Sequence, residues 1–213
     1  MLSLQDRKLR AKQINRRTKR PAPKREKLLD IAVNLFHREG YHSVSIDRIL
    51  EEANVSRPTF FKHFPSKDDL IVTAMKRRDA AARSNFRDAL IKQHDNPEQR
   101  LLAMFDLLAE WVQQENFTGC LFINATAEYA DPSDPIHQAA RDHKDAYREI
   151  ILEQTRLLAI ADPVDLAEKL MLLVDGLIVT AHVAGPRQFA QRAKELARVA
   201  IEHSTFGSRG ASH

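Results

Sequence analysis

Apolar residues recur along most of this chain at intervals of three and four positions, which is the period of a helix that buries one face. No stretch shows the sustained alternation of a half-buried strand, and glycine is scarce, with 6 among 213 residues. The pattern therefore predicts an all-α fold of about nine helices. We expect them at residues 24–39, 46–53, 57–63, 66–94, 97–115, 120–129, 135–159, 163–184 and 186–203.

The starts and ends of these helices follow from a few residues with strong local preferences. Ser45, Ser56 and Ser66 each precede a predicted helix, where a serine hydroxyl can accept a hydrogen bond from a free backbone N–H group. Ser66 is followed three positions later by Asp69, a spacing typical of a capping box. Gly40 can end the first helix. Three helices are therefore expected before the long one that starts at Ser66.

Positive charge is concentrated at the start of the chain. Residues 1–27 contain eleven lysines and arginines against two acidic residues, a net charge of +9, so that the remainder carries −5 of the overall +4. This asymmetry indicates a polyanion bound at the N-terminal end through neutralisation of phosphates. Residues 1–23 lack a clear apolar stripe and predict a flexible arm that becomes ordered on DNA, with a merely solubilising tail as the alternative. Residues 205–213 are expected to be a frayed tail.

Membrane insertion and export are not indicated. An apolar run such as Leu166–Ala184 is interrupted by charged residues and a histidine, so it is not clean enough to cross a bilayer. The basic N-terminal segment lacks the apolar stretch and the cleavage site of a secretory signal. A single cysteine, Cys120, excludes an intramolecular disulfide and fits a reducing compartment. We therefore expect a cytoplasmic protein without a membrane partner.

Residues 45–67 combine a short apolar helix, a brief turn and a second short helix that begins at a serine, the arrangement of a helix-turn-helix. Within them, the run VSRPTFFKHFPSK over residues 55–67 resembles the recognition-helix signature of the TetR family. The resemblance covers about residues 24–70. It implies a three-helix DNA-binding domain at residues 24–66 and a helical ligand-binding and dimerisation domain at residues 67–204.

The resemblance also implies which side chains face DNA. Arg57, Pro58, Thr59 and Lys62 would lie on the early, outward part of the second short helix, where side chains reach base edges in the major groove. Hydroxyls and cationic side chains near the helix starts would bind phosphates, although Lys67 could also be an ordinary solvated charge. The expected DNA-binding residues are Lys24, Arg25, Ser45, Ser56, Arg57, Pro58, Thr59, Phe61, Lys62, His63 and Lys67.

Two positions depart from the family pattern. Phe61 stands where the family usually has a tyrosine, so the phosphate contact of that hydroxyl is lost. Pro58 takes a position that is often glycine, and proline removes a backbone N–H group while it stiffens the helix start. Phe60 and Phe64 are expected to pack into the core of the small domain instead of touching DNA.

The resemblance weakens beyond about residue 70, although GCLFIN at residues 119–124 is similar to stretches in many TetR-like regulators. It implies a small-molecule effector held among the later helices. The candidate lining residues are Phe105, Trp111, Cys120, Phe122, Tyr147, Ile178 and His182. Ordinary core packing is the alternative for each, but Trp111 and His182 carry polar atoms that an apolar core would leave unsatisfied. Cys120 is either a thiol sensor at a helix N-terminus or a buried structural cysteine.

Neither a metal nor another cofactor is expected. His137 and His143 are six positions apart and so do not share a helix face, which makes them poor metal ligands. An enzyme is not expected either, because the sequence lacks the Glu-x-x-His pairs of carboxylate bundles, a nucleophile elbow and a phosphate-binding loop.

The last two long helices carry more apolar surface than one subunit can readily cover, which predicts a homodimer formed through them. A two-fold dimer in turn implies a roughly palindromic operator in double-stranded DNA. The sequence therefore favours a transcriptional repressor that a ligand releases from its operator. The main alternative is an architectural DNA-binding protein without an effector, and a helical-bundle enzyme is the more remote one.

Overall fold

The computed structural model describes residues 23–185 and 188–209. Every regular element within these residues is an α-helix, which confirms the predicted fold class. The helices are α2 (Pro23–Glu39), α3 (Ile46–Ala53), α4 (Arg57–His63), α5 (Lys67–Gln93), α6 (Pro97–Val112), α7 (Leu121–Glu128), α8 (Pro135–Thr155), α9 (Pro163–Ala184) and α10 (Phe189–Arg209).

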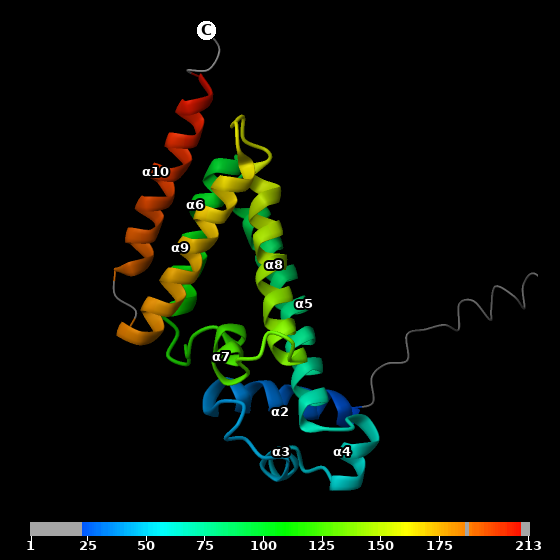
Figure 1. Cartoon of the computed structure of the whole chain (residues 1–213). Coiled ribbons are helices and arrows are strands. Elements are labelled where there is room, and N and C mark those ends of the chain that lie inside the picture. Colours follow the sequence, from blue (N-terminus) through cyan, green and yellow to red (C-terminus); the bar gives the residue numbers. More distant parts are fainter. Residues whose placement is uncertain (1–22, 186–187, 210–213) are drawn as a thin grey trace, which may run out of the picture.

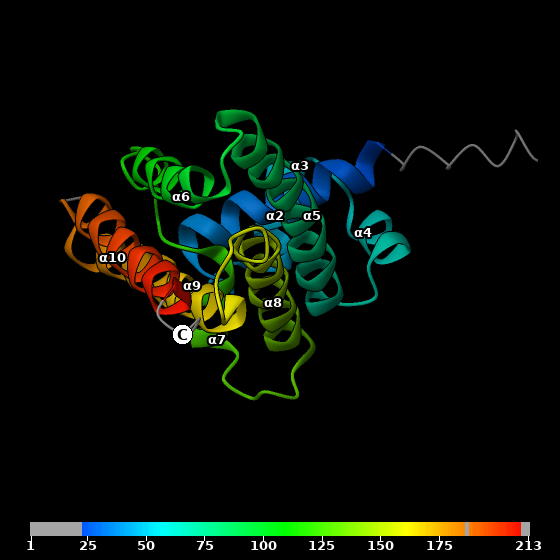
Figure 2. The ribbon, with the colours of Figure 1, turned by 90° about the horizontal axis from the view of Figure 1, so that it is seen from above.

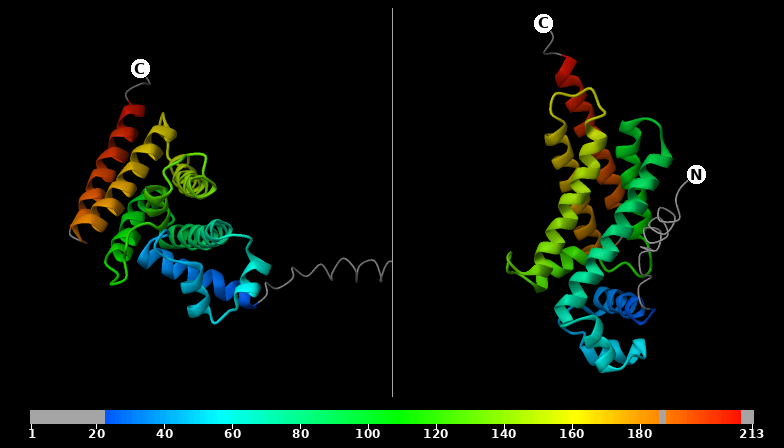
Figure 3. Two further views of the ribbon diagram at one scale, coloured as in Figure 1. Left: turned by 60° about the horizontal axis from the view of Figure 1, so that its bottom comes forward. Right: turned by 90° about the vertical axis from the view of Figure 1, so that its right-hand side faces the viewer.

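The helices form a small N-terminal unit and a larger C-terminal unit (Figure 1). The N-terminal unit consists of α2, α3 and α4, and α5 rises out of it into the larger unit. There α5 packs against α8, and α10 packs against both α9 and α6. Contacts between α8 and α9 join the pair α5 and α8 to the group α6, α9 and α10. The views from above and from two further directions show the same grouping (Figures 2 and 3). Because α4 lies at the opposite end of the molecule from the last turns of α10, its outer face is free of the other helices.

The N-terminal unit is held together by one apolar side of each of its three helices. Most of the apolar side chains of this unit are enclosed almost completely. Phe60 and Phe64 are 0% and 2% exposed, which confirms that both pack into the core. The other buried side chains of this unit include Leu28, Leu29, Leu35, Phe36, Ile49 and Val55.

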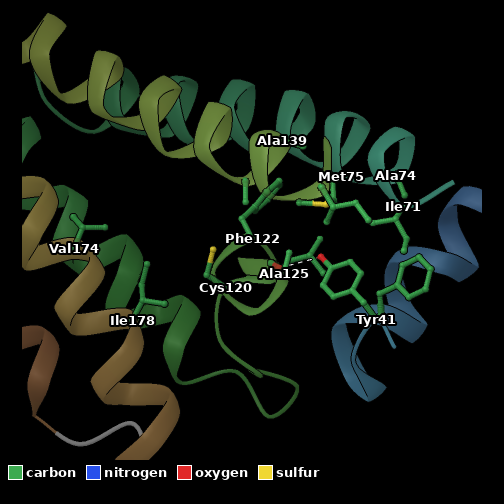
Figure 4. Packing of buried hydrophobic residues seen from close by; sticks show 14 of the residues in the cluster. Tyr41, Ile71, Ala74, Met75, Cys120, Phe122, Ala125, Ala139, Val174 and Ile178 are labelled. Carbon is green, nitrogen blue, oxygen red and sulfur yellow. Dashed lines mark hydrogen bonds between the residues drawn. The ribbon is translucent and has the colours of Figure 1, made fainter. Parts of the chain in front are cut away.

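The same apolar core continues into the C-terminal unit through the first turns of α5. Figure 4 shows Ile71, Ala74 and Met75 of α5 directed toward Tyr41 on one side and Phe122 on the other. All of these side chains are buried in a single cluster. The apolar core is therefore continuous across the domain boundary predicted at residue 66.

Several helix ends differ from the sequence prediction. α6 ends at Val112 instead of residue 115, and α8 ends at Thr155 instead of residue 159. After both ends the backbone bonds tighten to the three-residue spacing of a 3₁₀ turn, as in Gln114 N to Trp111 O at 3.2 Å. Apolar periodicity extends past these points, so it could not locate the change in hydrogen bonding.

The two chain ends also bear on the predictions. The last helix begins at Phe189 and reaches Arg209, so the prediction of a frayed tail is wrong for residues 205–209. The basic arm predicted over residues 1–23 lies outside the described residues, apart from Pro23 at the start of α2. No helix in the described ranges is both long enough and apolar enough to cross a membrane.

Candidate DNA-reading surface and effector region

The turn between α3 and α4 sets the angle at which α4 is presented. Ser45 caps α3 by accepting a hydrogen bond from the backbone N–H of Arg48 at 3.1 Å, as predicted. Asn54 then adopts a left-handed conformation with φ of 49°, which ends α3 and redirects the chain. Left-handed backbone is uncommon for any residue except glycine, and asparagine tolerates it better than most. This turn gives the segment its helix-turn-helix geometry.

The N-terminus of α4 is not capped in the way the sequence suggested. The prediction that the Ser56 hydroxyl bonds to a backbone N–H group of α4 is wrong, because that side chain makes no such bond. It lies 2.9 Å from the hydroxyl of Thr59 instead. Both hydroxyls therefore form a polar pair at the start of the helix, where Pro58 contributes no N–H group.

The outward face of α4 carries the side chains that the sequence assigned to DNA. Arg57, Pro58 and Lys62 are exposed, and the ring of Phe61 is 45% exposed although it is apolar. Thr59 and His63 are partly covered. A short helix with cationic and apolar groups on its free side matches what the major groove accepts.

Arg57 is not a free side chain. Its Nη2 donates to Oδ1 of Asp47 on α3 at 2.5 Å, while more than half of each side chain stays exposed. Asp47 was missed by sequence reasoning, because the two residues are ten positions apart and belong to different helices. In this structure the guanidinium at the first position of α4 therefore points toward α3.

Lys67 and Arg25, which the sequence assigned to DNA, also make contacts within the protein. Lys67 donates from Nζ to the carbonyl oxygen of Tyr41 at 2.5 Å, and burial lowers the pKa of its ammonium group. The alternative of a purely solvated charge therefore does not describe Lys67. Arg25 lies over the ring of Phe64 at 5.3 Å and pairs with Glu26, whereas Lys24 is exposed.

The seven predicted effector-lining residues fall into several contact groups. Phe105 lines a surface groove of about 510 Å³ between α6 and α10, which none of the other six residues lines. Trp111 contacts the edge of Phe117 at 5.0 Å, and Phe117 in turn contacts His182 at 6.2 Å. Tyr147 belongs to a different group of rings, with Phe86 of α5 at 5.2 Å and His143 of α8 at 4.6 Å. These contacts do not join Tyr147 to Trp111 and His182, and a shared space between the three stays a prediction.

The remaining three predicted residues lie in the core around α7. Cys120 is 7% exposed and its side chain makes no capping hydrogen bond, which favours the structural alternative for this cysteine. Figure 4 shows Ile178 of α9 on the side of α7 that carries Cys120. The Phe122 ring stacks on His143 with ring centroids 3.6 Å apart and an angle of 5° between the planes.

His143 is the residue of this region that sequence reasoning dismissed. It was considered only as a metal ligand, whereas the structure buries it and places its Nδ1 2.8 Å from Oδ1 of Asp79 on α5. Asp79 is 64 positions away in the chain, so no local spacing could reveal the pair. Within the described ranges, no group of three potential metal ligands is present.

Glu128, at the end of α7, joins the C-terminal unit to the N-terminal one. Its Oε1 accepts the backbone N–H of Tyr41 at 2.8 Å, and its Oε2 accepts the backbone N–H of His42 at 2.6 Å. Burial alone would raise the pKa of Glu128, but the N–H donors of Tyr41 and His42 outweigh burial and lower it. The carboxylate therefore stays ionised and holds the loop between α2 and α3.

Further contacts reinforce this junction. The hydroxyl of Tyr41 donates to the carbonyl oxygen of Leu121 at 3.0 Å, and the ring points toward α7 in Figure 4. The hydroxyl of Thr118 donates to the carbonyl oxygen of His37 at 2.9 Å. The segment from Thr118 to Glu128 is thus bonded to the N-terminal unit at both of its ends.

Comparison with known proteins identifies the architecture. The family model described as bacterial regulatory proteins of the tetR family matches residues 28–74. A second model, described as the C-terminal domain of tetracyclin repressor-like proteins, matches residues 97–197. The chain belongs to the TetR family.

Individual relatives agree with this assignment. The HTH-type transcriptional regulator YjdC of Escherichia coli is 28% identical over 152 residues, which are 71% of this chain and 80% of that protein. The HTH-type transcriptional repressor NemR of Escherichia coli is 28% identical over 116 residues, 54% of this chain and 58% of that protein. The crystal structure of SCO4454, a TetR-family regulator of Streptomyces coelicolor, superposes with a TM-score of 0.79 at 28% identity, over 85% of this chain and 96% of that one.

This TetR-family protein is therefore a DNA-binding transcriptional regulator, as the sequence predicted. The family match covers the helix-turn-helix and the surrounding helices, and α4 is the exposed helix of that motif. The family match does not by itself give the pairing of Arg57 with Asp47, the junction at Glu128 or the burial of His143. Each of these depends on contacts between different elements of this structure.

Proposed function

We propose that this regulator is a cytoplasmic homodimer that represses transcription from a palindromic operator and releases it when a small molecule binds the C-terminal unit. The exposed cationic side chains of α4, Arg57 and Lys62, support the DNA-binding part of the proposal. Regulation, and not catalysis, is the role that we assign to the C-terminal helices. An operator selected from random DNA should be palindromic, and a selected site without two-fold symmetry would contradict the proposal.

The proposed dimer is supported by apolar side chains that one subunit leaves uncovered. On α9, Leu172, Val179 and Val183 recur at helical spacing with Gly176 between them, and Leu172 and Val183 are 73% and 80% exposed. On α10, Leu196 and Val199 are also more than half exposed. Figure 4 shows that the buried side chains Val174 and Ile178 of α9 point inward, so the exposed stripe lies on another side of that helix. We infer that α9 and α10 of two subunits cover these stripes in a four-helix bundle.

The release step is supported by the way α5 connects the units. Its first residue, Lys67, is bonded to Tyr41 of the N-terminal unit, and Asp79 on the same helix is bonded to His143 of α8. The two positions are about 18 Å apart along the helix axis at the usual rise per residue. A ligand that moves α8 against α5 can thus change the direction of α4. An architectural DNA-binding protein, the alternative function, would bind DNA equally well with and without any ligand.

The ion pair between Arg57 and Asp47 yields a first prediction about base recognition. An exposed ion pair contributes little to stability, and a carboxylate near DNA repels phosphates. We infer that Asp47 directs the Arg57 guanidinium toward a base edge. Asp47→Asn is therefore expected to reduce the ratio of operator to random-sequence affinity about tenfold, because a bidentate arginine contact is worth about 1–3 kcal/mol. Affinity for random DNA should stay the same or rise.

Competition binding with operator and random duplexes measures both affinities. Glu52→Gln is the matched control, because Glu52 also lies on α3 and pairs with an arginine, Arg48, at 3.1 Å. It should leave the ratio unchanged. If Asp47→Asn changed the affinities for operator and random DNA equally, Asp47 would act only through its charge and would not direct Arg57 toward a base.

A further inference from the structure

One apolar side chain of the N-terminal unit is left open on the helix that faces DNA. Phe61 is 45% exposed, and within the described part of the chain it is the only large apolar side chain of α2, α3 and α4 that is exposed. It is the fifth residue of α4, and its neighbours Arg57, Pro58 and Lys62 are exposed as well. A single exposed phenylalanine is ordinary on a protein surface. Phe61, however, lies within the face that we assign to DNA.

The ring of Phe61 rests against the core without being covered by it. Its centroid lies 5.2 Å from that of Phe60, which is fully buried, and the two ring planes meet at 84°. This edge contact supports one part of the Phe61 ring. A phenylalanine side chain has few torsion angles, so little conformational freedom is lost when the open part of the ring meets a partner. The ring therefore presents an apolar surface in a nearly fixed position.

None of the described helices is in place to cover the Phe61 ring. Within the subunit, α4 packs against α2 and α3, and the ring stays exposed in spite of these contacts. The proposed dimer joins α9 and α10, which lie on the opposite side of the molecule from α4 (Figures 1 and 2). The partner that fits this position is the DNA that α4 faces.

The groups of DNA within reach of α4 differ in what they offer an apolar ring. Phosphate oxygens are anionic and bind hydrogen-bond donors, which the phenylalanine side chain lacks. The base edges in the major groove present donors, acceptors and one kind of apolar group, the C5-methyl of thymine. A ring that covered a donor or an acceptor would remove its water without replacing the hydrogen bond. Contact with the thymine methyl carries no such cost.

We propose that Phe61 reads one thymine in each half of the operator by packing its ring on the C5-methyl group. Arg57 and Lys62, the exposed charged side chains of α4, are of the kinds that read guanine. Phe61 adds sensitivity to a thymine, so that the helix distinguishes both kinds of base pair. This inference rests on the proposed binding of a palindromic operator by α4, and it names one base that the helix recognises.

Replacement of thymine by uracil tests the proposal, because uracil lacks the methyl group and keeps the same hydrogen-bonding groups. The operator is first selected from random DNA with the full-length protein. Each thymine position is then changed to uracil in both half-sites together, and titration of the labelled duplex gives the affinity. One of these replacements should weaken binding about fourfold for each half-site, as expected when one methyl group is no longer buried, and so about fifteenfold in all.

Variants at Phe61 show whether its ring makes this methyl contact. Phe61→Ala removes the ring and should bind the thymine and uracil operators with equal affinity. Phe61→Leu keeps an apolar side chain and should retain part of the preference for thymine. Lys62→Ala is the matched control, because Lys62 is the exposed neighbour of Phe61 on the same helix. It should weaken binding of both duplexes and preserve their ratio. Circular dichroism establishes that each variant is folded.

A preference for thymine that Phe61→Ala abolishes and Lys62→Ala preserves would support the contact. Selected half-sites without thymine, or no thymine whose replacement by uracil weakens binding, would overturn it. A thymine preference that Phe61→Ala retains would also overturn it, and an equal loss of operator and random-sequence affinity in that variant would place the ring on the DNA backbone instead. The proposed function is judged separately, by whether the unaltered protein prefers a palindromic operator to random DNA.

Discussion

Val183→Glu is expected to convert the dimer into a monomer and to weaken operator binding by at least about a hundredfold. Val183 is 80% exposed in one subunit and lies in the apolar stripe of α9. A glutamate there would place an unpaired charge in the four-helix bundle. A monomer grips one half-site only, and the loss of the second linked contact commonly costs a factor of about 10²–10⁴. Light scattering after size-exclusion chromatography gives the oligomeric state, and titration of labelled operator gives the affinity.

The matched control places the same charge on another exposed apolar residue. Leu157 is 60% exposed in the loop after α8, outside the stripes of α9 and α10. Leu157→Glu should remain dimeric and bind the operator with unchanged affinity. If Val183→Glu also stayed dimeric, the interface would have to lie elsewhere on the molecule, and the inferred bundle of α9 and α10 would be wrong.

The second large effect is expected at the junction between the two units. Glu128→Ala would leave the N–H groups of Tyr41 and His42 without their partner, at distances that are now 2.8 and 2.6 Å. Hydrogen bonds to a charged group contribute about 1.5–3 kcal/mol each, and partial solvent access reduces that figure. We therefore expect the free energy of unfolding to fall by about 2–4 kcal/mol. Urea denaturation followed by circular dichroism measures it.

Glu153→Ala provides the comparison. Glu153 pairs with Arg87 at 2.8 Å, but both side chains are about half exposed and no backbone group depends on them. Its removal should cost less than about 0.5 kcal/mol, as is usual for surface ion pairs. A loss in Glu128→Ala no larger than that in Glu153→Ala would show that the carboxylate does not hold the loop.

The Glu128 variant also tests the transmission of the ligand signal. If the junction at α7 helps to set the direction of α4, Glu128→Ala should weaken the effect of a ligand on operator binding as well as the stability of the protein. Coupling between two sites is reciprocal, so the operator should then also affect ligand affinity less than it does in the unaltered protein. Unchanged coupling in a destabilised Glu128→Ala would leave α5 as the sole connection.

The sequence alone determined the features that depend on neighbouring residues. The helical period of apolar positions predicted the all-α class and nearly all helix starts, because a helix that buries one face repeats every three to four residues. The serine caps at Ser45 and Ser66 were recognisable for the same reason, since a cap bonds within its own turn. The helix-turn-helix and its family could be identified because the run from Val55 to Lys67 is continuous in the chain.

Tertiary structure decided what the long-range contacts make of these elements. The pairs Asp47 with Arg57, Asp79 with His143 and Glu128 with Tyr41 join residues that are 10, 64 and 87 positions apart. No period or motif links such positions, because their distance is set by how whole helices pack. The neutral state of His143 likewise arises from burial among three helices, and a histidine in a sequence carries no sign of the rings that will enclose it.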